Sequence, residues 1–425
     1  MLFLFQVIVL ALISQGHEAI AADGPTWSSV VVPVNKHTDT ANPLYSVRMY
    51  INNMGYTQQK FVIDLDAPFI WHYAWPYQES CETCPVAMTC GASQCTEMRT
   101  TYSYQAPSCP PPNNASYGDR YWDCEYCPVN VIHPVTGECE QVLPMFDDKF
   151  MMNKFDGRHV LSDLYSTTVN DACAAPWIFE NKFPAGVEGV MALSSSLYAF
   201  PANLHDPVKK IVALCLPSAL WPPGLLFFGN GPYYLPTQSD VDVRSLLSYT
   251  PLLKQPDSFG YFIGVDHIVI KKRSLKVPAN TTAKISTLDP YTTLRTDIYN
   301  SVVHRFSMVT KRIPPAKPVA PFGLCFNTST IDPKVGIKVP SIDLALQGGK
   351  TWSISTRNSI KQVTNDVACL AFIDAGATSK NAIVVGAFQF EDNFLTFNLE
   401  NSTFGFSSSL SRANISCANF FYFGP

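Results

Sequence analysis

The sequence predicts an all-β chain built from two related halves. Short alternating runs dominate it, such as Ser28 to Val34 and Tyr45 to Ile51. Only two stretches favour a short helix, around Tyr198 to Ile211 and around Arg295 to Thr310. With 425 residues, of which 47% are hydrophobic and 15% charged, the chain is long enough for two cores. Single cores stop growing at roughly 250–300 residues.

An apolar strand that carries one aspartate into a tight turn occurs twice. The first unit is Phe61 to Trp71, which contains Asp64. The second is Lys284 to Leu294, which contains Asp289 about 225 residues further along the chain. An aspartic protease uses two such units, each of which brings one carboxyl group to a shared cleft. The repeat therefore predicts an internal duplication in which each lobe offers one Asp.

The residues after each Asp differ from those that peptide cleavage needs. Two carboxyl groups that share a proton must lie close together, which requires small residues in an Asp-Thr/Ser-Gly pattern. Here Asp64 is followed by Leu-Asp, and Asp289 is followed by Pro-Tyr. Pro gives no N–H to the loop, and Tyr fills space that Gly leaves free. We expect a degenerate catalytic site. The alternative role for each Asp is a turn in which its side chain bonds its own backbone.

The first residues indicate the compartment. Leu2 to Ile13 is apolar apart from Gln6, and small residues end at Ala22. This pattern predicts a cleaved secretory signal peptide at residues 1–22. A buried N-terminal strand is the alternative, because the first residues lack Lys and Arg. The net charge of -4 gives no electrostatic reason to expect nucleic acid or a membrane as a partner, and no later segment is apolar enough to span a bilayer.

The thirteen Cys agree with an oxidising compartment. Eight of them crowd into the Pro- and Asn-rich stretch 76–145, which we expect disulfides to hold together. Its two C-x-x-C pairs, Cys81–Cys84 and Cys124–Cys127, fit disulfides better than zinc. The odd total leaves a free thiol or an intermolecular link. Five sequons are candidate glycosylation sites: Asn114, Asn280, Asn327, Asn401 and Asn414.

Several segments along almost the whole chain resemble one plant family. They are Cys127–Cys139, Gly189–Leu193, Leu214–Pro217, Phe228–Tyr233, Ser286–Thr292, Val339–Leu344, Gln389–Asn393, Phe404–Ser407 and Cys417–Phe420. Through them the sequence resembles the extracellular glucanase and xylanase inhibitors, a group that includes the carrot epidermal glycoprotein and the legume basic 7S globulins. The resemblance implies a bilobal pepsin-like (aspartic protease) fold with a Cys-rich insertion and a degenerate peptidase site. We place the N-terminal lobe at residues 23–245, its insertion at about 76–145, and the C-terminal lobe at 246–425.

The resemblance also implies a function, the inhibition of a secreted microbial glycoside hydrolase at the plant cell wall. Such enzymes carry two carboxylates roughly 5–9 Å apart, between which an inserted cation makes charge-assisted hydrogen bonds. The nearest candidates for this cation on C-lobe loops are Lys334 and Arg412, and the alternative is that both are solvated loop charges. The wheat inhibitors use a His after Gly-Phe-Ser, but Ser407–Arg412 contains none. This difference favours a family 12 endoglucanase over a family 11 xylanase as the target.

Two other functions stay open. One is an active aspartic peptidase, and the other is a storage or peptide-binding protein like the basic 7S globulins. The ordinary charge and modest Arg and Gln content disfavour storage. We expect no metal and no cofactor, because the eight His show no close ligand spacing.

Overall fold

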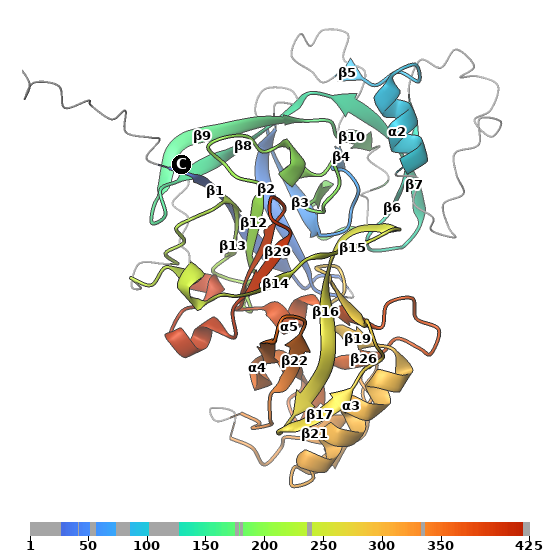
Figure 1. The fold of residues 1–425 in the computed structure, drawn as a ribbon, viewed down its shortest axis with the longest axis vertical. Coiled ribbons are helices and arrows are strands. Elements are labelled where there is room, and N and C mark those ends of the chain that lie inside the picture. The colour runs from blue at the N-terminus through green and yellow to red at the C-terminus, as the bar shows by residue number, and fades with distance from the viewer. Residues whose placement is uncertain are drawn as a thin grey trace, which may run out of the picture.

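The computed structural model describes residues 27–40, 42–51, 57–73, 86–101, 127–174, 178, 182–235, 240–332 and 336–419. Within these ranges the chain is mostly β-stranded and forms two lobes (Figure 1). Strands of the first half, blue to green, make up the upper lobe, and the yellow and orange elements make up most of the lower one. The prediction of an all-β, two-lobed chain is confirmed.

A 16-stranded sheet runs through the upper lobe and into the middle of the molecule. Its strands are β1 (Ser29–His37), β2 (Leu44–Ile51), β3 (Thr57–Asp64), β4 (Trp71–Tyr73), β5 (Val86–Ala87), β6 (Val129–Ile132), β7 (Cys139–Phe146), β8 (Asp148–Phe155), β9 (Val160–Val169), β10 (Ala172–Ala174), β11 (Gly189–Ala192), β12 (Ile211–Cys215), β13 (Gly224–Gly229), β14 (Ser248–Pro251), β28 (Phe394–Asn398) and β29 (Thr403–Phe406). Because β12 pairs with β28, the two halves of the chain share this sheet.

The lower lobe holds a nine-stranded and a four-stranded sheet in the described residues. The nine strands are β15 (Leu253–Gln255), β16 (Ser258–Ile270), β17 (Arg273–Lys276), β18 (Thr282–Ile285), β19 (Thr292–Leu294), β22 (Ile342–Leu346), β23 (Lys350–Ile354), β26 (Phe372–Asp374) and β27 (Ile383–Val385). The other four are β20 (Pro315–Ala316), β21 (Cys325–Asn327), β24 (Ile360–Thr364) and β25 (Val367–Leu370). The predicted lobe boundary at residue 245 stays a prediction.

Helices are few and short. They are α2 (Ser93–Thr101), α3 (Thr296–Val309), α4 (Thr356–Ser359) and α5 (Ala387–Phe390), with the 3-10 turns η2 (Phe200–Asn203), η3 (Val243–Leu246), η4 (Leu410–Ala413) and η5 (Cys417–Asn419). Helix α3 confirms the second expected helix, since Ile298, Val302 and Phe306 recur on one buried face. The first expected helix is only the turn η2, because Pro201 and Pro207 interrupt a longer one. No helix in the described ranges is long and apolar enough to cross a membrane.

The Cys-rich stretch contains more regular structure than its sequence pattern indicates. Strands β6 and β7 form an antiparallel hairpin, and the disulfide Cys95–Cys127 joins helix α2 to the start of that hairpin. Two more disulfides, Cys215–Cys417 and Cys325–Cys369, lie outside the stretch. Cys173 is a free, buried thiol, in line with the odd number of Cys.

Candidate functional site

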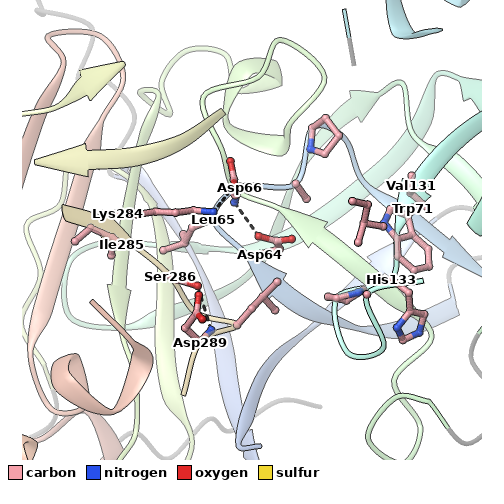
Figure 2. Close-up of a pocket in the computed structure, with 16 residues that line it drawn as sticks. Asp64, Leu65, Asp66, Trp71, Val131, His133, Lys284, Ile285, Ser286 and Asp289 are labelled. Atoms are coloured by element: carbon pink, nitrogen blue, oxygen red, sulfur yellow. Dashed lines mark hydrogen bonds and ion pairs between the residues drawn. The ribbon is translucent and has the colours of Figure 1, made fainter. Parts of the chain in front are cut away.

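A cavity of about 240 Å³ lies where the two lobes meet (Figure 2). The loops after β3 and β18 form one wall, so both predicted aspartates, Asp64 and Asp289, line it. The turn between β6 and β7 closes the other side, where Trp71 and His133 stand across from Lys284. The structure thus brings the two Asp-bearing units together at one site.

The strand register identifies which residues of the two halves are equivalent. In the first half β11 runs parallel to β3 and pairs Gly189 with Phe61. In the second half β27 runs parallel to β18 and pairs Ile383 with Ala283. Phe61 therefore corresponds to Ala283, a shift of 222 residues.

The next strand of each half agrees with this shift. Strand β11 pairs Val190 with Trp71, and strand β27 pairs Val384 with Thr293, which is again 222 residues further along. At this shift the counterpart of Asp64 is Ser286, not Asp289. The repeat in the sequence pairs Asp64 with Asp289 because they are the same residue type. In the structure, Asp289 lies three residues after Ser286, which is the position equivalent to Asp64.

The loop around Ser286 is held by hydroxyl groups. The Ser286 hydroxyl, which is buried, accepts a hydrogen bond from the Asp289 backbone N–H at 3.1 Å. The next residue, Thr287, donates from Oγ1 to the carbonyl oxygen of Ile63 at 2.7 Å and so ties the second loop to the strand that precedes Asp64. A hydroxyl at the Ser286 position has no acidic proton to share with Asp64 in the pH range where carboxyl pairs work.

Asp64 itself makes the hydrogen bond of a turn residue. Its Oδ1 accepts from the backbone N–H of Asp66 at 2.8 Å. Burial raises the pKa of Asp64 to about 6, and the nearby charge of Asp66 adds to this rise, while Lys284 opposes it. Asp64 therefore changes its charge in mildly acidic solution.

Asp66 stands at the Gly position of the peptidase pattern, and its carboxylate reaches across to the other lobe. Ser258 on β16 donates to its Oδ1 at 2.7 Å. Lys284 on β18 donates to its Oδ2 in a mostly buried ion pair. Figure 2 shows Lys284 directed at Asp66 beside Asp64. The three side chains Asp66, Ser258 and Lys284, which we name the interlobe clamp, join the two lobes at the cavity.

His133 closes the cavity as an uncharged ring. Its Nδ1 accepts from the backbone N–H groups of Val135 and Thr136, each at 3.2 Å. Its ring packs on Phe183 with centroids 4.4 Å apart. Burial, followed by the charge of Lys182, lowers the pKa of His133 to about 4. The ring is thus neutral at physiological pH and serves packing here.

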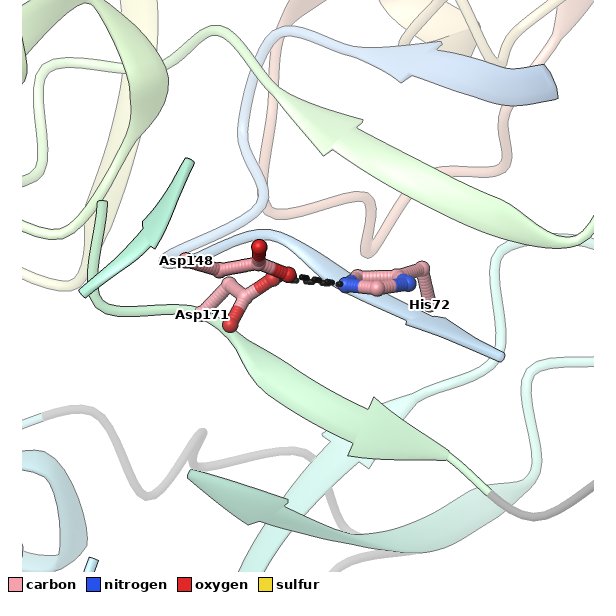
Figure 3. Close-up of side chains that lie close together, drawn as sticks. All are labelled: His72, Asp148 and Asp171. Atoms are coloured by element: carbon pink, nitrogen blue, oxygen red, sulfur yellow. Dashed lines mark hydrogen bonds and ion pairs between the residues drawn. The ribbon is translucent and has the colours of Figure 1, made fainter. Parts of the chain in front are cut away.

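A second group of charges lies inside the upper lobe, away from the cavity lining. His72 on β4, Asp148 on β8 and Asp171 beside β10 are all buried, and both carboxylates point at the ring of His72 (Figure 3). The His72 Nε2 lies 2.7 Å from Asp171 and 3.2 Å from Asp148. We name these three residues the His72 triad. Among the described residues, these three lie close enough together to hold a metal ion. Their spacing in the sequence gives no indication of this cluster.

The hydrogen bonds of the His72 triad indicate a protonated ring. The Nδ1 of His72 faces two acceptors, the side-chain oxygen of Gln59 at 2.9 Å and the carbonyl oxygen of Tyr73 at 3.1 Å. Because Nε2 faces the carboxyl groups of Asp171 and Asp148, both ring nitrogens donate a proton when these carboxyl groups are ionised. Burial alone would lower the pKa of His72, but Asp171 and Asp148 outweigh it and raise the pKa to about 10. The contacts therefore fit a buried imidazolium between two carboxyl groups.

The predicted binding and glycosylation residues lie elsewhere. Arg412 is exposed on η4, whereas Lys334 lies outside the described residues. Asn114 and the predicted signal peptide also lie outside them. The other four sequon residues are all exposed: Asn280, Asn327, Asn401 and Asn414.

Comparison with known proteins identifies the family. A model described as the xylanase inhibitor N-terminal domain matches residues 45–230, and its C-terminal counterpart matches 260–408. Among curated relatives, chitinase CLP of Oryza sativa subsp. japonica is 31% identical over 400 residues, covering 90% of this chain and 89% of the relative. Probable aspartic proteinase GIP2 of Nicotiana benthamiana is 32% identical over 389 residues, covering 84% of each chain.

A solved structure gives the same assignment. The crystal structure of edgp matches with a TM-score of 0.78 and 28% sequence identity, over 94% of this chain and 99% of that chain. The pepsin-like two-lobed fold implied by the resemblance is confirmed. The chain belongs to the xylanase-inhibitor family of pepsin-like proteins.

Proposed function

We propose that this protein is a secreted inhibitor of microbial glycoside hydrolases that lacks peptidase activity. The observation that carries the proposal is the match of both halves to xylanase-inhibitor models, combined with a serine at the position equivalent to Asp64. The protein is thus proposed to bind a hydrolase without cleaving peptides itself. The fold is kept, while the carboxyl pair that activates water in a peptidase is not.

The interlobe clamp supports the loss of peptidase activity. Lys284 and Ser258 hold the Asp66 carboxylate at the turn where the peptidase pattern has Gly. A Gly at that position leaves room for close backbone approach, whereas a paired carboxylate fills the room and adds charge. With Asp64 bonded to the same turn, the first loop has a structural role.

Inhibition requires a surface other than the interlobe cavity. Of the two candidate cations, Arg412 is the one that lies within the described residues. Its guanidinium is exposed on η4, from which it can enter the cleft of a partner. There it would make charge-assisted, bidentate hydrogen bonds with the paired carboxylates of a glycoside hydrolase. Lys334 is the second candidate cation. A family 12 endoglucanase fits this use of Arg better than a family 11 xylanase blocked by His.

The test is an inhibition assay on a panel that includes a family 12 endoglucanase and a family 11 xylanase. Equimolar protein should abolish activity of the endoglucanase. Arg412→Ala should weaken inhibition by about 10- to 100-fold, because a hydrogen bond between charged groups contributes about 1.5–3 kcal/mol. Arg273→Ala, another exposed arginine of the C-terminal half, is the matched control. Inhibition of no enzyme in the panel would refute the proposal.

Peptidase activity is the alternative that the name of the Nicotiana benthamiana relative raises. Casein digestion at acidic pH measures it directly. We expect no cleavage. Cleavage that pepstatin blocks and Asp64→Asn abolishes would establish a peptidase instead.

Secretion and glycosylation are part of the same proposal. Removal of residues 1–22 is measured by N-terminal sequencing of protein from the culture medium. Glycans are expected at the exposed sequons Asn280, Asn327, Asn401 and Asn414, and at Asn114, and peptide mass spectrometry reads each site.

A further inference from the structure

The loop between β12 and β13 presents two large apolar side chains to solvent. Leu220 is 59% exposed and the adjacent Trp221 is 69% exposed. An exposed tryptophan presents a large apolar surface to water, and a partner that buries this surface gains binding energy. Tryptophan is also enriched among the residues that dominate protein–protein binding energy. Neither residue takes part in the cavity described above.

The base of this loop is firmly anchored. Ser218 donates from its hydroxyl to Asp392 at 2.5 Å, and its carbonyl oxygen accepts from Lys36 at 2.9 Å. The backbone N–H of Asp392 donates to Leu216 at 2.9 Å. The disulfide Cys215–Cys417 fixes the end of β12 to the segment after η4. A pre-ordered loop loses little conformational entropy when a partner binds.

Asp392 also gathers cationic side chains next to the loop. The guanidinium of Arg357 lies 3.6 Å from the Asp392 carboxylate and is itself exposed. The Asp392 carbonyl oxygen accepts from Leu410 at 3.1 Å, which places η4 and its exposed Arg412 beside the same residue. The buried carboxylate of Asp392 thus has hydroxyl, backbone and guanidinium partners, of which the exposed Arg357 is one, and the exposed Arg412 lies two residues from Leu410.

The apolar and cationic residues are close enough to contact one partner. Trp221 is three residues from Ser218, which spans at most about 11 Å of chain. Arg412 is two residues from Leu410 in a 3-10 turn, a rise of about 4 Å. When the two hydrogen-bonded contacts through Asp392 are included, the Cα atoms of Trp221 and Arg412 lie within roughly 30 Å of each other. A standard interface covers about 800 Å² on each partner, which is a patch wider than this separation.

We propose that the target glycoside hydrolase binds a surface formed by Leu220, Trp221, Arg357 and Arg412, which we name the Trp221 surface. The inference rests on the proposed function and extends it from one cation to an apolar anchor on the other half of the chain. The arginines complement the carboxylates of the enzyme cleft, and Leu220 and Trp221 pack on the apolar rim beside that cleft. Charge complementarity sets the rate of association, and burial of the tryptophan slows dissociation.

The experiment measures association and dissociation rates of the intact protein on the panel enzyme that it inhibits. Trp221→Ala should raise the dissociation rate about 30-fold or more, and Leu220→Ala about 5-fold. An Arg357→Ala, Arg412→Ala double variant should also lower the association rate and its dependence on salt. Leu197→Ala removes an equally exposed apolar side chain, 70% exposed on the loop after β11, and should leave both rates unchanged. The variants of Leu197, Leu220 and Trp221 should unfold at the temperature of the wild type, because these side chains are exposed. The double variant also removes the ion pair between Arg357 and buried Asp392, so it should unfold at a lower temperature.

The outcomes separate this inference from the proposed function. If the wild type inhibits no panel enzyme, the proposed function and the Trp221 surface fall together. If the wild type inhibits and Trp221→Ala binds equally well, or Leu197→Ala binds as weakly as Trp221→Ala, the inference is overturned and the proposed function stands. A dimer of this chain that Trp221→Ala dissociates in sedimentation would assign the surface to a second copy and also overturn the inference.

Discussion

The two halves of the molecule share a strand register but differ in charge at equivalent positions. A shift of 222 residues relates the charged positions of the first half to uncharged ones in the second: Asp64 to Ser286, Asp66 to Leu288 and His72 to Leu294. Backbone pairing and buried apolar side chains set the register of a strand, so polar residues at its end can change without moving it. The backbone scaffold and the charged residues at its strand ends therefore diverge independently.

The charged residues of the first half need oppositely charged partners, which come from either half of the chain. Asp66 takes its cation, Lys284, from the second half. His72 takes its two carboxyl groups, Asp148 and Asp171, from its own half. Removing one member of a buried ion pair leaves an uncompensated charge, which costs more than the pair contributes. The comparison can therefore be tested by neutralising the charged positions of the first half or by removing their partners.

The largest effect is expected for His72→Leu, which copies Leu294. It leaves Asp148 and Asp171 buried without a cation, so the free energy of unfolding at pH 7 should fall by about 3–5 kcal/mol in urea. Adding Asp148→Asn and Asp171→Asn should restore part of the loss. A loss below about 1 kcal/mol would show that His72 carries no stabilising charge.

The pH dependence of the wild type follows from the same triad. The raised pKa of His72 means that its stabilising charge is fully present below the unfolded value of 6.5 and is lost as the pH rises through about 10. Burial, followed by the charge of Asp148, raises the pKa of Asp171 from 3.8 to about 7, so its contribution to stability is lost in the same direction but between about pH 4 and 7. Stability should thus decrease steadily from pH 6.5 to 10, measured by urea unfolding at each pH.

A smaller effect is expected for Lys284→Ala in the interlobe clamp. Asp66 and Asp64 lose their nearby cation, but some solvent reaches the pair, so the loss should be about 2 kcal/mol. The pKa of Asp64 should rise further above 6, which a carbon-13 NMR titration measures. Lys380→Ala is the control, because its pair with Asp257 is 79% and 54% exposed. That variant should lose less than about 0.5 kcal/mol, and an equal loss in both would refute a special role for the clamp.

The smallest effect is expected for Asp64→Asn. The folded pKa of Asp64 lies near 6, above its ordinary value of 3.8, so its contribution to stability is present below pH 3.8 and is lost as the pH rises through 6. The Asn variant should show a flatter stability profile between pH 4 and 6. An unchanged profile would mean that Asp64 titrates normally in the folded protein.

The sequence predicts the repeated strand and turn units well because their apolar patterns are local. It does not predict which polar residues correspond, since residue type pairs Asp64 with Asp289 and only hydrogen-bond register identifies Ser286. The partners of the charges are equally hidden. Lys284 lies 218 residues from Asp66, and Asp148 and Asp171 lie 76 and 99 residues from His72. No local pattern relates residues that only the tertiary fold brings together.

The proposed binding residues also depend on the tertiary fold. The family resemblance indicates Arg412 because a cation precedes the last Cys, but it does not reveal Leu220 and Trp221. Their role is inferred from exposure and from contacts to Asp392, which depend on three segments far apart in the sequence. Solvent exposure of an apolar loop residue is a property of the folded surface.

The disulfide Cys215–Cys417 has a consequence for the integrity of the chain. It links residues 202 positions apart, one in each half, and β12 pairs with β28 just beside it. A proteolytic nick in the connection between the halves would therefore leave two fragments that stay covalently joined and share one sheet. They would run as a single band on a non-reducing gel and separate only after reduction. The folded protein can in this way survive limited proteolysis by the very microbes whose enzymes it is proposed to meet.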